Sequence, residues 1–225
     1  MRYVRIDALK EGMINGKPIF GQNSELLLRE GVVLREPYIR RLKEMGYQGI
    51  YIKDLFSDGI TVNDIIDPAL RIECVKTIKD AYLCVSKEKI IHSNIVQKLK
   101  TLLDKIIDSV TSNDELLMNI IDLKNYDDYT YSHSVNVTIL SLSVGYVMGL
   151  SKNMLFCLGM AALLHDIGKV FIPRDIINKS SKLNEKELEI VRTHSFKGYQ
   201  ILKDNNSFSY YSSIGVLHHH EKYNG

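Results

Sequence analysis

The feature that most constrains the fold is a change of pattern at Pro68, after which apolar residues recur at helical spacing. In the first stretch after it, Leu70, Cys74, Ile78 and Ala81 stand three or four positions apart. This spacing is typical of an amphipathic helix. The stretch NIVQKLKTLLDKIIDSV repeats it, and DELLMNIIDLK predicts a further helix. Gly168 is expected to end the helix of MLFCLGMAALLHDI, and Asn184 with Glu187 predicts a capping box at the start of the next helix. Because no strand-like alternation returns after Pro68, we expect a helical bundle.

The first 55 residues have a different pattern, with Gly, Pro and β-branched residues close together. MINGKPIF, ELLLREGVVL and GIYIKD predict short strands, and REPYIRRLKEMGYQ predicts a short helix. We therefore expect a mainly α protein with a small α+β accessory domain at 1–60. A helical linker with the first bundle helices follows at 61–125, and a helical domain at 126–225.

Charge and hydropathy restrict the partners. Lys and Arg total 29 against 27 Asp and Glu, so no global field favours a nucleic-acid polymer or an anionic membrane. The longest apolar run, Met154–Leu164, is shorter than the ~20 residues of a membrane span. The N-terminus lacks the apolar segment of a signal peptide. Cys74, Cys84 and Cys157 are expected to be buried free thiols, which fits a cytoplasmic protein.

The stretch ALLHDIGK carries the most chemistry. His165 and Asp166 are adjacent at the end of an otherwise apolar helix, and buried ionisable groups need partners. Imidazole and carboxylate are good ligands for a divalent metal, and a carboxylate can bridge two. An ion pair between Asp166 and Lys169 would explain the same residues without a metal.

Histidines gather in the second part of the chain. Of seven, all but His92 lie within 133–225. Taken singly, His133 fits a core histidine, His194 a surface one, and the run His218–His220 a surface cluster or a purification tag. Taken together, histidines on several helical segments favour a metal centre inside the bundle.

A family resemblance joins these motifs. HDIGK, preceded by YSHS and followed by H-x-x-x-G and then HHE-x-x-N-G, closely resembles the HD-GYP group of HD-domain phosphohydrolases over residues 126–225. The first part of the chain resembles the small domain that often precedes such modules. The family signature reads H-H-E-x-x-D-G-x-G-Y-P, so we expect it to be cut off after Gly225, before a further Asp ligand. The run of histidines is then half of a signature, and His218 is expected to support the ligands.

The resemblance implies a role for each matching residue. Asp166 would bridge two metals, His194, His219 and His220 would complete the shell of one, and His133 and His165 would hold the other. Lys169 would contact the substrate phosphate. Tyr129 stands where members with a third metal carry Glu, which favours two metals.

The implied activity is metal-dependent hydrolysis of cyclic di-GMP by a hydroxide that bridges two divalent ions, with Fe or Mn expected. Two alternatives stay open: a catalytically silent or truncated signalling module, and a phosphohydrolase for another nucleotide. The accessory domain would serve a homodimer or a signalling partner.

Overall fold

The computed structural model describes residues 1–225 except 22–24, 61–63, 113–129, 223 and 225. The chain forms two compact units, residues 1–64 with 117–133, and residues 65–116 with 134–225. Tyr129 and the helix predicted for DELLMNIIDLK lie outside the described residues. The division at 60 and 125 stays a prediction.

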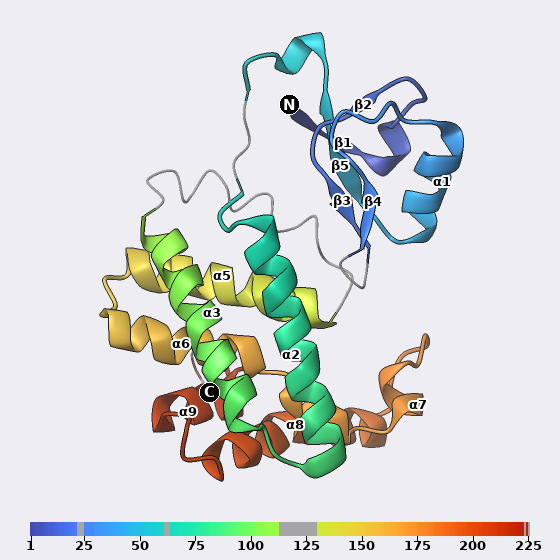
Figure 1. The fold of residues 1–225 in the computed structure, drawn as a ribbon. Helices are drawn as coiled ribbons and strands as arrows, with labels where there is room; N and C mark the ends of the chain where they lie inside the picture. Colours follow the sequence, from blue (N-terminus) through green and yellow to red (C-terminus); the bar gives the residue numbers. More distant parts are fainter. Residues whose placement is uncertain (22–24, 61–63, 113–129, 223, 225) are drawn as a thin grey trace. The chain divides into compact units, whose positions relative to one another are not determined.

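Strands occur in the N-terminal unit (Figure 1). Strand β5 pairs antiparallel with β1 on one side and β2 on the other, and β3 pairs with β4. The bounds are β1 Arg2–Arg5, β2 Ile14–Asn15, β3 Ile19–Phe20, β4 Leu26–Leu28 and β5 Gly49–Lys53. The strands predicted around β2 to β5 are confirmed. Strand β1 was not predicted, because its RYVR pattern is short and half charged.

Helix α1 (Glu36–Glu44) follows the strands as predicted. Pro37 occupies its first turn, and Gly46 follows its end with a φ of 84°. Ile39 and Leu42 of α1 pack with Leu34 and Ile52 in one apolar core. The 3-10 turns η1 (Ile6–Ala8) and η2 (Leu55–Ser57) lie in the same unit.

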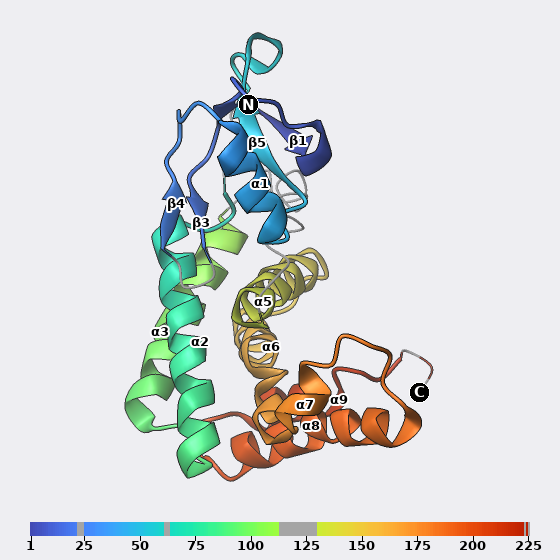
Figure 2. The same cartoon turned by 90° about the vertical axis from the view of Figure 1, so that its right-hand side faces the viewer.

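The second unit is helical, as predicted, and the chain as a whole is mainly α. Figure 2 shows α7, α8 and α9 gathered at one end of this unit. The bounds are α2 Pro68–Glu88, α3 Ser93–Thr111, α5 Thr130–Val147, α6 Lys152–Leu164, η4 Ile167–Phe171, α7 Arg174–Ile177, α8 Glu185–Lys203 and α9 Tyr210–His218. The predicted stripe of α2 is buried at Cys74, Ile78 and Ala81.

Two predicted helix boundaries had different outcomes. The capping box is present, because Asn184 accepts a hydrogen bond from the Glu187 backbone while the Glu187 carboxylate accepts one from the Asn184 backbone. The prediction that Gly168 ends the preceding helix is wrong. Helix α6 ends at Leu164, and Gly168 lies inside η4. The lack of a side chain at Gly168 lets η4 pack closely against the backbone of α8.

The apolar segment Lys152–Phe171, which covers α6 and η4, is long and apolar enough to cross a membrane by length and composition. It is the one such segment among the described residues, and 61% of its apolar 18-residue window is buried inside the structure. A single segment of this kind is weak evidence for a span, because the core helix of a helical domain passes the same test. The apolar run Met154–Leu164 noted in the sequence is shorter than this segment, because it ends before η4 begins.

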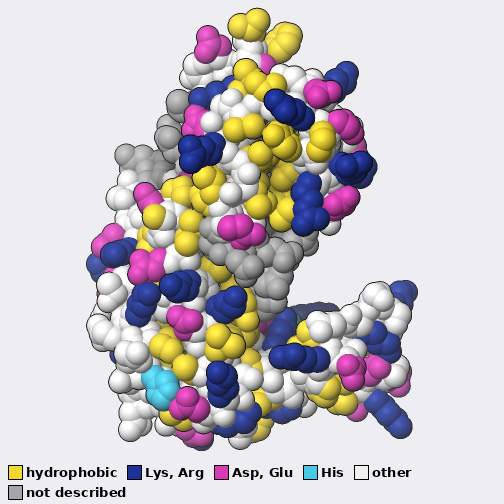
Figure 3. All heavy atoms as spheres, turned by 45° about the vertical axis from the view of Figure 1, so that its right-hand side comes forward, with side chains coloured by type: hydrophobic (Ala, Val, Ile, Leu, Met, Phe, Trp, Pro, Cys, Tyr) yellow, Lys and Arg dark blue, Asp and Glu magenta, His cyan; other side chains and the backbone are white. Residues whose placement is uncertain are grey.

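Surface charge is mixed on the face drawn in Figure 3, where Lys and Arg alternate with Asp and Glu. A mixed surface creates no extended field of one sign. This face agrees with the near balance of charges in the sequence.

Candidate metal centre

His165 and Asp166 lie between the end of α6 and the start of η4. Helix α6 begins at the Ser151 cap and buries most of its apolar residues. His165 is its C-cap residue, and Asp166 is the N-cap residue of η4. His165 is 8% exposed and Asp166 is 2% exposed. The junction between the α-helix and the 3-10 helix therefore places two buried polar side chains, His165 and Asp166, next to each other.

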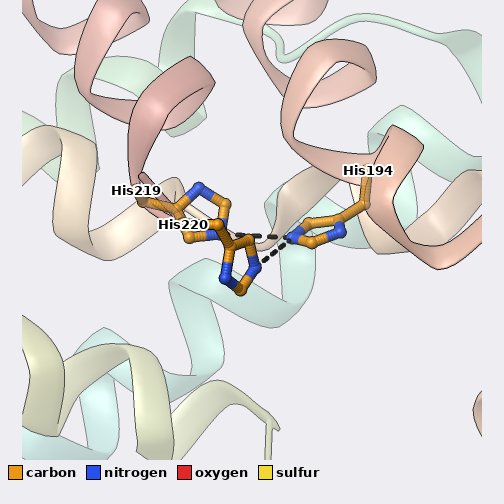
Figure 4. Close-up of side chains that lie close together, drawn as sticks. All are labelled: His194, His219 and His220. Atoms are coloured by element: carbon orange, nitrogen blue, oxygen red, sulfur yellow. Dashed lines mark hydrogen bonds between the residues drawn. The ribbon is translucent and has the colours of Figure 1, made fainter. Parts of the chain in front are cut away.

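Two further elements bring three more imidazoles together. His194 comes from the middle of α8, and His219 and His220 follow the end of α9. Figure 4 shows these three rings converging from the two elements. The Nε2 atom of His194 lies 3.1 Å from Nε2 of His219 and 3.2 Å from Nε2 of His220. Their ligand atoms all lie within 4.8 Å of one another.

Backbone carbonyls orient the rings. In each of three histidines, Nδ1 lies 2.5–2.8 Å from the carbonyl oxygen three residues earlier: His165 to Ala162, His194 to Val191 and His219 to Val216. A carbonyl can only accept, so each Nδ1 carries its hydrogen. In the neutral ring the lone pair is then on Nε2. This is the arrangement that orients histidine ligands in metal sites.

The donor set fits a divalent cation. In neutral rings of this tautomer, the Nε2 atoms of His194 and His219 face each other with their lone pairs, which repel unless a positive charge lies beside them. Metal–nitrogen bonds of about 2.0–2.1 Å place neighbouring ligands about 3.0–3.4 Å apart. The two Nε2–Nε2 distances of 3.1 and 3.2 Å match that separation.

Asp166 faces two groups of partners with its two oxygens. Oδ1 lies 3.4 Å from Nε2 of His194 and 3.9 Å from Nε2 of His219. Oδ2 lies 3.2 Å from Nε2 of His165 and 2.7 Å from Nζ of Lys169. A carboxylate placed in this way can bind one cation through each oxygen.

The surroundings set the charge of these groups. Burial acts to raise the pKa of Asp166, but its contacts with His165, His194 and the ammonium of Lys169 outweigh burial and hold the pKa well below its ordinary value. Burial lowers the pKa of His219 to about 4, and burial also lowers the pKa of His220. At neutral pH the centre therefore presents an ionised Asp166 and neutral His219 and His220, the forms that bind metals.

His133 lies in the second turn of α5, which continues into the helical unit at Ser134. One ligand atom each of His133, His165 and Asp166 lie within 4.8 Å of one another. All six residues proposed as ligands thus belong to two groups that could hold a metal. Asp166 belongs to the second group, and its Oδ1 lies 3.4 Å from Nε2 of His194 in the first.

The other residues named from the sequence lie as follows. Lys169 forms the ion pair with Asp166 that was the alternative to a metal, and its side chain is 35% exposed. His218 is exposed and faces Glu221 at 3.9 Å, so its expected supporting role is wrong. His92 is paired with Glu88 at the surface. Cys74 is buried as predicted, whereas Cys84 and Cys157 are half-buried.

Glycines let the helices that carry the ligands approach one another closely. This role of the glycines was not predicted from the sequence. A Cβ added at Gly168 would lie 1.9 Å from the carbonyl oxygen of His194. A Cβ added at Gly215 would lie 2.6 Å from the Cβ of Ala161. The H-x-x-x-G motif could have indicated such a contact, because a spacing of four residues places Gly198 on the same face of α8 as His194.

Comparison with known proteins decides the family. Residues 115–225 match the model of the HD domain. This part of the chain belongs to the HD domain family. It is of the HD-GYP type that the motifs resemble. HD domains bind divalent metals, and the two His and Asp groups are where this one could do so.

Several curated proteins are similar. A cyclic di-GMP phosphodiesterase of Pseudomonas aeruginosa is 38% identical over 124 residues, 55% of this chain and 30% of that protein. A cyclic di-GMP phosphodiesterase of Thermotoga maritima is 30% identical over 167 residues, 71% of this chain and 43% of that protein. A 3′3′-cGAMP-specific phosphodiesterase of Vibrio cholerae is 34% identical over 89 residues, 40% of this chain and 20% of that protein. The chain spans less than half the length of each.

Proposed function

We propose that the protein is a metal-dependent phosphodiesterase that hydrolyses cyclic di-GMP. The observation that carries the proposal is the position of Asp166, whose Oδ1 faces His194 and His219 while Oδ2 faces His165. Relatives named cyclic di-GMP phosphodiesterases support the choice of substrate.

In this proposal each group holds one cation, and Asp166 binds both. His194, His219 and His220 complete one shell, and His133 and His165 contribute to the other. A set of five imidazoles and one carboxylate suits Fe or Mn. When bound, two such cations lower the pKa of a shared water toward neutrality and offset negative charge on phosphoryl oxygens.

The chain's own residues prepare the centre for the substrate. The carbonyls of Ala162, Val191 and Val216 keep three Nε2 atoms directed inward. Lys169 now bonds to Asp166, and its side chain is half-buried at the edge of the centre. Its ammonium would donate to a phosphate oxygen of the substrate and offset the charge that develops there during hydrolysis.

The remaining assignments belong to the same proposal. Residues 126–225 form the metal-binding domain, residues 61–125 lead into it, and residues 1–60 form an accessory domain for a second copy or a signalling partner. The protein acts in the cytoplasm, where its cyclic dinucleotide substrate signals, and does not bind a nucleic-acid polymer or span a membrane.

The test uses protein loaded with Mn(II) or Fe(II), incubated with cyclic di-GMP and analysed by chromatography for pGpG and GMP. We expect product from the native protein and from His92→Ala, which removes an exposed histidine that pairs with Glu88 and belongs to neither group of ligands. Asp166→Asn should yield no product and bind less metal, measured by elemental analysis. Equal metal content in Asp166→Asn and native protein would contradict the bridging role.

A second candidate substrate comes from the relatives named for 3′3′-cGAMP. Including this cyclic dinucleotide in the same assay separates the two substrates by their kcat/KM values. Binding of either messenger without product would instead favour a silent signalling module, and turnover of an unrelated nucleotide alone would favour the third alternative.

A further inference from the structure

The N-terminal unit contains a hollow that the phosphodiesterase proposal does not use. It is lined by residues of β1, β2, β3 and β5 and of the segments beside them, including Tyr3, Phe20, Tyr47 and Tyr51. Aromatic walls with a few polar groups are typical of sites for small planar ligands.

The polar groups are an ammonium and a carboxylate side by side. Nζ of Lys17 lies 2.8 Å from Oδ1 of Asp64, and the two side chains are only 12% and 29% exposed. The same Nζ lies 4.9 Å from the centre of the Tyr51 ring. In the part of the chain that the structure describes, Oδ2 of Asp64 has no hydrogen-bond or ion-pair partner. The hollow therefore offers a donor next to an acceptor.

The backbone holds this pair in place. Asn15 is fully buried, and its Nδ2 donates to the carbonyl oxygens of Lys17, at 2.5 Å, and Arg29, at 2.9 Å. Gly49 leaves room for the ring of Tyr3, because a Cβ there would lie 2.6 Å from two Tyr3 side-chain atoms. The buried amide thus fixes the backbone of Lys17, while Asp64 and the Tyr51 ring hold its ammonium, so the pair has little freedom to lose on binding.

We propose that this hollow binds the base of a guanine nucleoside. Guanine presents two adjacent N–H donors beside a carbonyl acceptor on one edge. A carboxylate can accept both N–H groups and an ammonium can donate to the carbonyl. Adenine and cytosine each present one exocyclic donor beside a ring acceptor, so they can donate to one oxygen of Asp64, whereas guanine can donate to both.

Asp64→Asn gives the sharpest test, because it changes one oxygen to an N–H₂ donor. Xanthine carries a carbonyl where guanine carries its amino group, so the variant should prefer xanthosine. Asp7→Asn is the matched control, since Asp7 pairs with Lys43 at 2.9 Å in the same unit but is exposed and outside the hollow.

Binding is measured by equilibrium dialysis of the full chain with guanosine, xanthosine, adenosine and cytidine in the presence of EDTA. These nucleosides lack phosphate and the metals are removed, so the result is independent of the phosphodiesterase proposal. We expect saturable binding of guanosine, with adenosine and cytidine weaker by about tenfold or more. Asp64→Asn should bind guanosine more weakly by a similar factor and bind xanthosine more tightly than native protein does. Asp7→Asn should bind all four nucleosides as native protein does.

Absence of guanosine binding at millimolar concentration would overturn the proposal. So would equal binding of adenosine, or unchanged guanosine binding in Asp64→Asn with its circular dichroism spectrum intact. If Asp64→Asn does not fold, Lys17→Met takes its place and is expected to lose guanosine without gaining xanthosine.

Discussion

The position of one hydrogen decides what each imidazole of the centre can do. His194 and His219 each hold that hydrogen on Nδ1, against the carbonyls of Val191 and Val216. Their Nε2 atoms are thereby left as lone-pair donors that face Asp166. A histidine with the same spacing but no carbonyl behind it would lack this orientation, so the local helical geometry is part of the site.

Lys169 separates metal binding from substrate binding at the residue scale. We predict that Lys169→Gln keeps the metal content of native protein but lowers kcat/KM for the cyclic dinucleotide by about 100-fold, because charge developing on the phosphoryl oxygens loses its donor. Lys186→Gln, an exposed residue in the first turn of α8, is the control and should be unchanged. Elemental analysis and product chromatography measure both effects. A loss of metal in Lys169→Gln would mean that the lysine acts through Asp166 alone.

The three thiols should differ in reactivity. Burial raises the pKa of Cys74 to about 12, so it stays protonated at ordinary pH, and the thiolate is the reactive form. We predict that iodoacetamide at pH 8 modifies Cys84 and Cys157, which are half-buried, well before Cys74. Peptide mass spectrometry of native protein gives the order, and unfolding in guanidinium should remove the difference. Modification of Cys74 at the same rate as the others in folded protein would contradict its burial.

At the scale of elements, the centre depends on how closely η4, α8 and α9 approach one another. Gly168 allows η4 to meet the backbone of α8 at His194, and Gly215 allows α9 to meet α6 at Ala161. Backbone atoms cannot move aside as the end of a flexible side chain can. Small residues at these contacts therefore determine the distances between ligands on different helices.

Gly168→Ala should show this dependence. The added methyl group would collide with the carbonyl of His194, so we predict a loss of about 2–3 kcal/mol in the free energy of unfolding together with weaker metal binding. Gly145→Ala is the matched control. Its methyl group would meet three leucine methyl groups at 3.0–3.1 Å, which can shift, so metal binding should stay native. Equal metal affinity for both variants, by titration calorimetry, would contradict the role of Gly168.

The capping box of α8 predicts a pH dependence. Hydrogen bonds from Lys179 and from the Asn184 backbone lower the pKa of Glu187 below its ordinary value of 4.5. A carboxyl group whose pKa is lower in the folded protein stabilises the fold above its unfolded pKa. This stabilisation is lost as pH falls from the unfolded pKa through the folded pKa. Glu187→Gln should therefore lower Tm at pH 7, and the difference from native protein should shrink below pH 4.5. A difference independent of pH, by circular dichroism, would argue against the ionised cap.

At the scale of the whole molecule, patterns with a strong local cause were predictable. The apolar stripes gave α2 and α3, and Asn184 with Glu187 gave the start of α8. Local patterns did not predict β1, because its residues become a strand only by pairing with β5. They also misread Gly168, whose neighbour at His194 is distant in sequence. The six ligand candidates came from a family resemblance, since spacing alone could not show that separate helices converge.

The most direct test of the central claim is anomalous diffraction from crystals of the Mn(II)-loaded protein. The account predicts one metal peak within bonding distance of His194, His219, His220 and Oδ1 of Asp166, and a second beside Oδ2 of Asp166, His165 and His133. Metal peaks elsewhere, with Asp166 still bonded only to Lys169 and its neighbouring histidines, would contradict it.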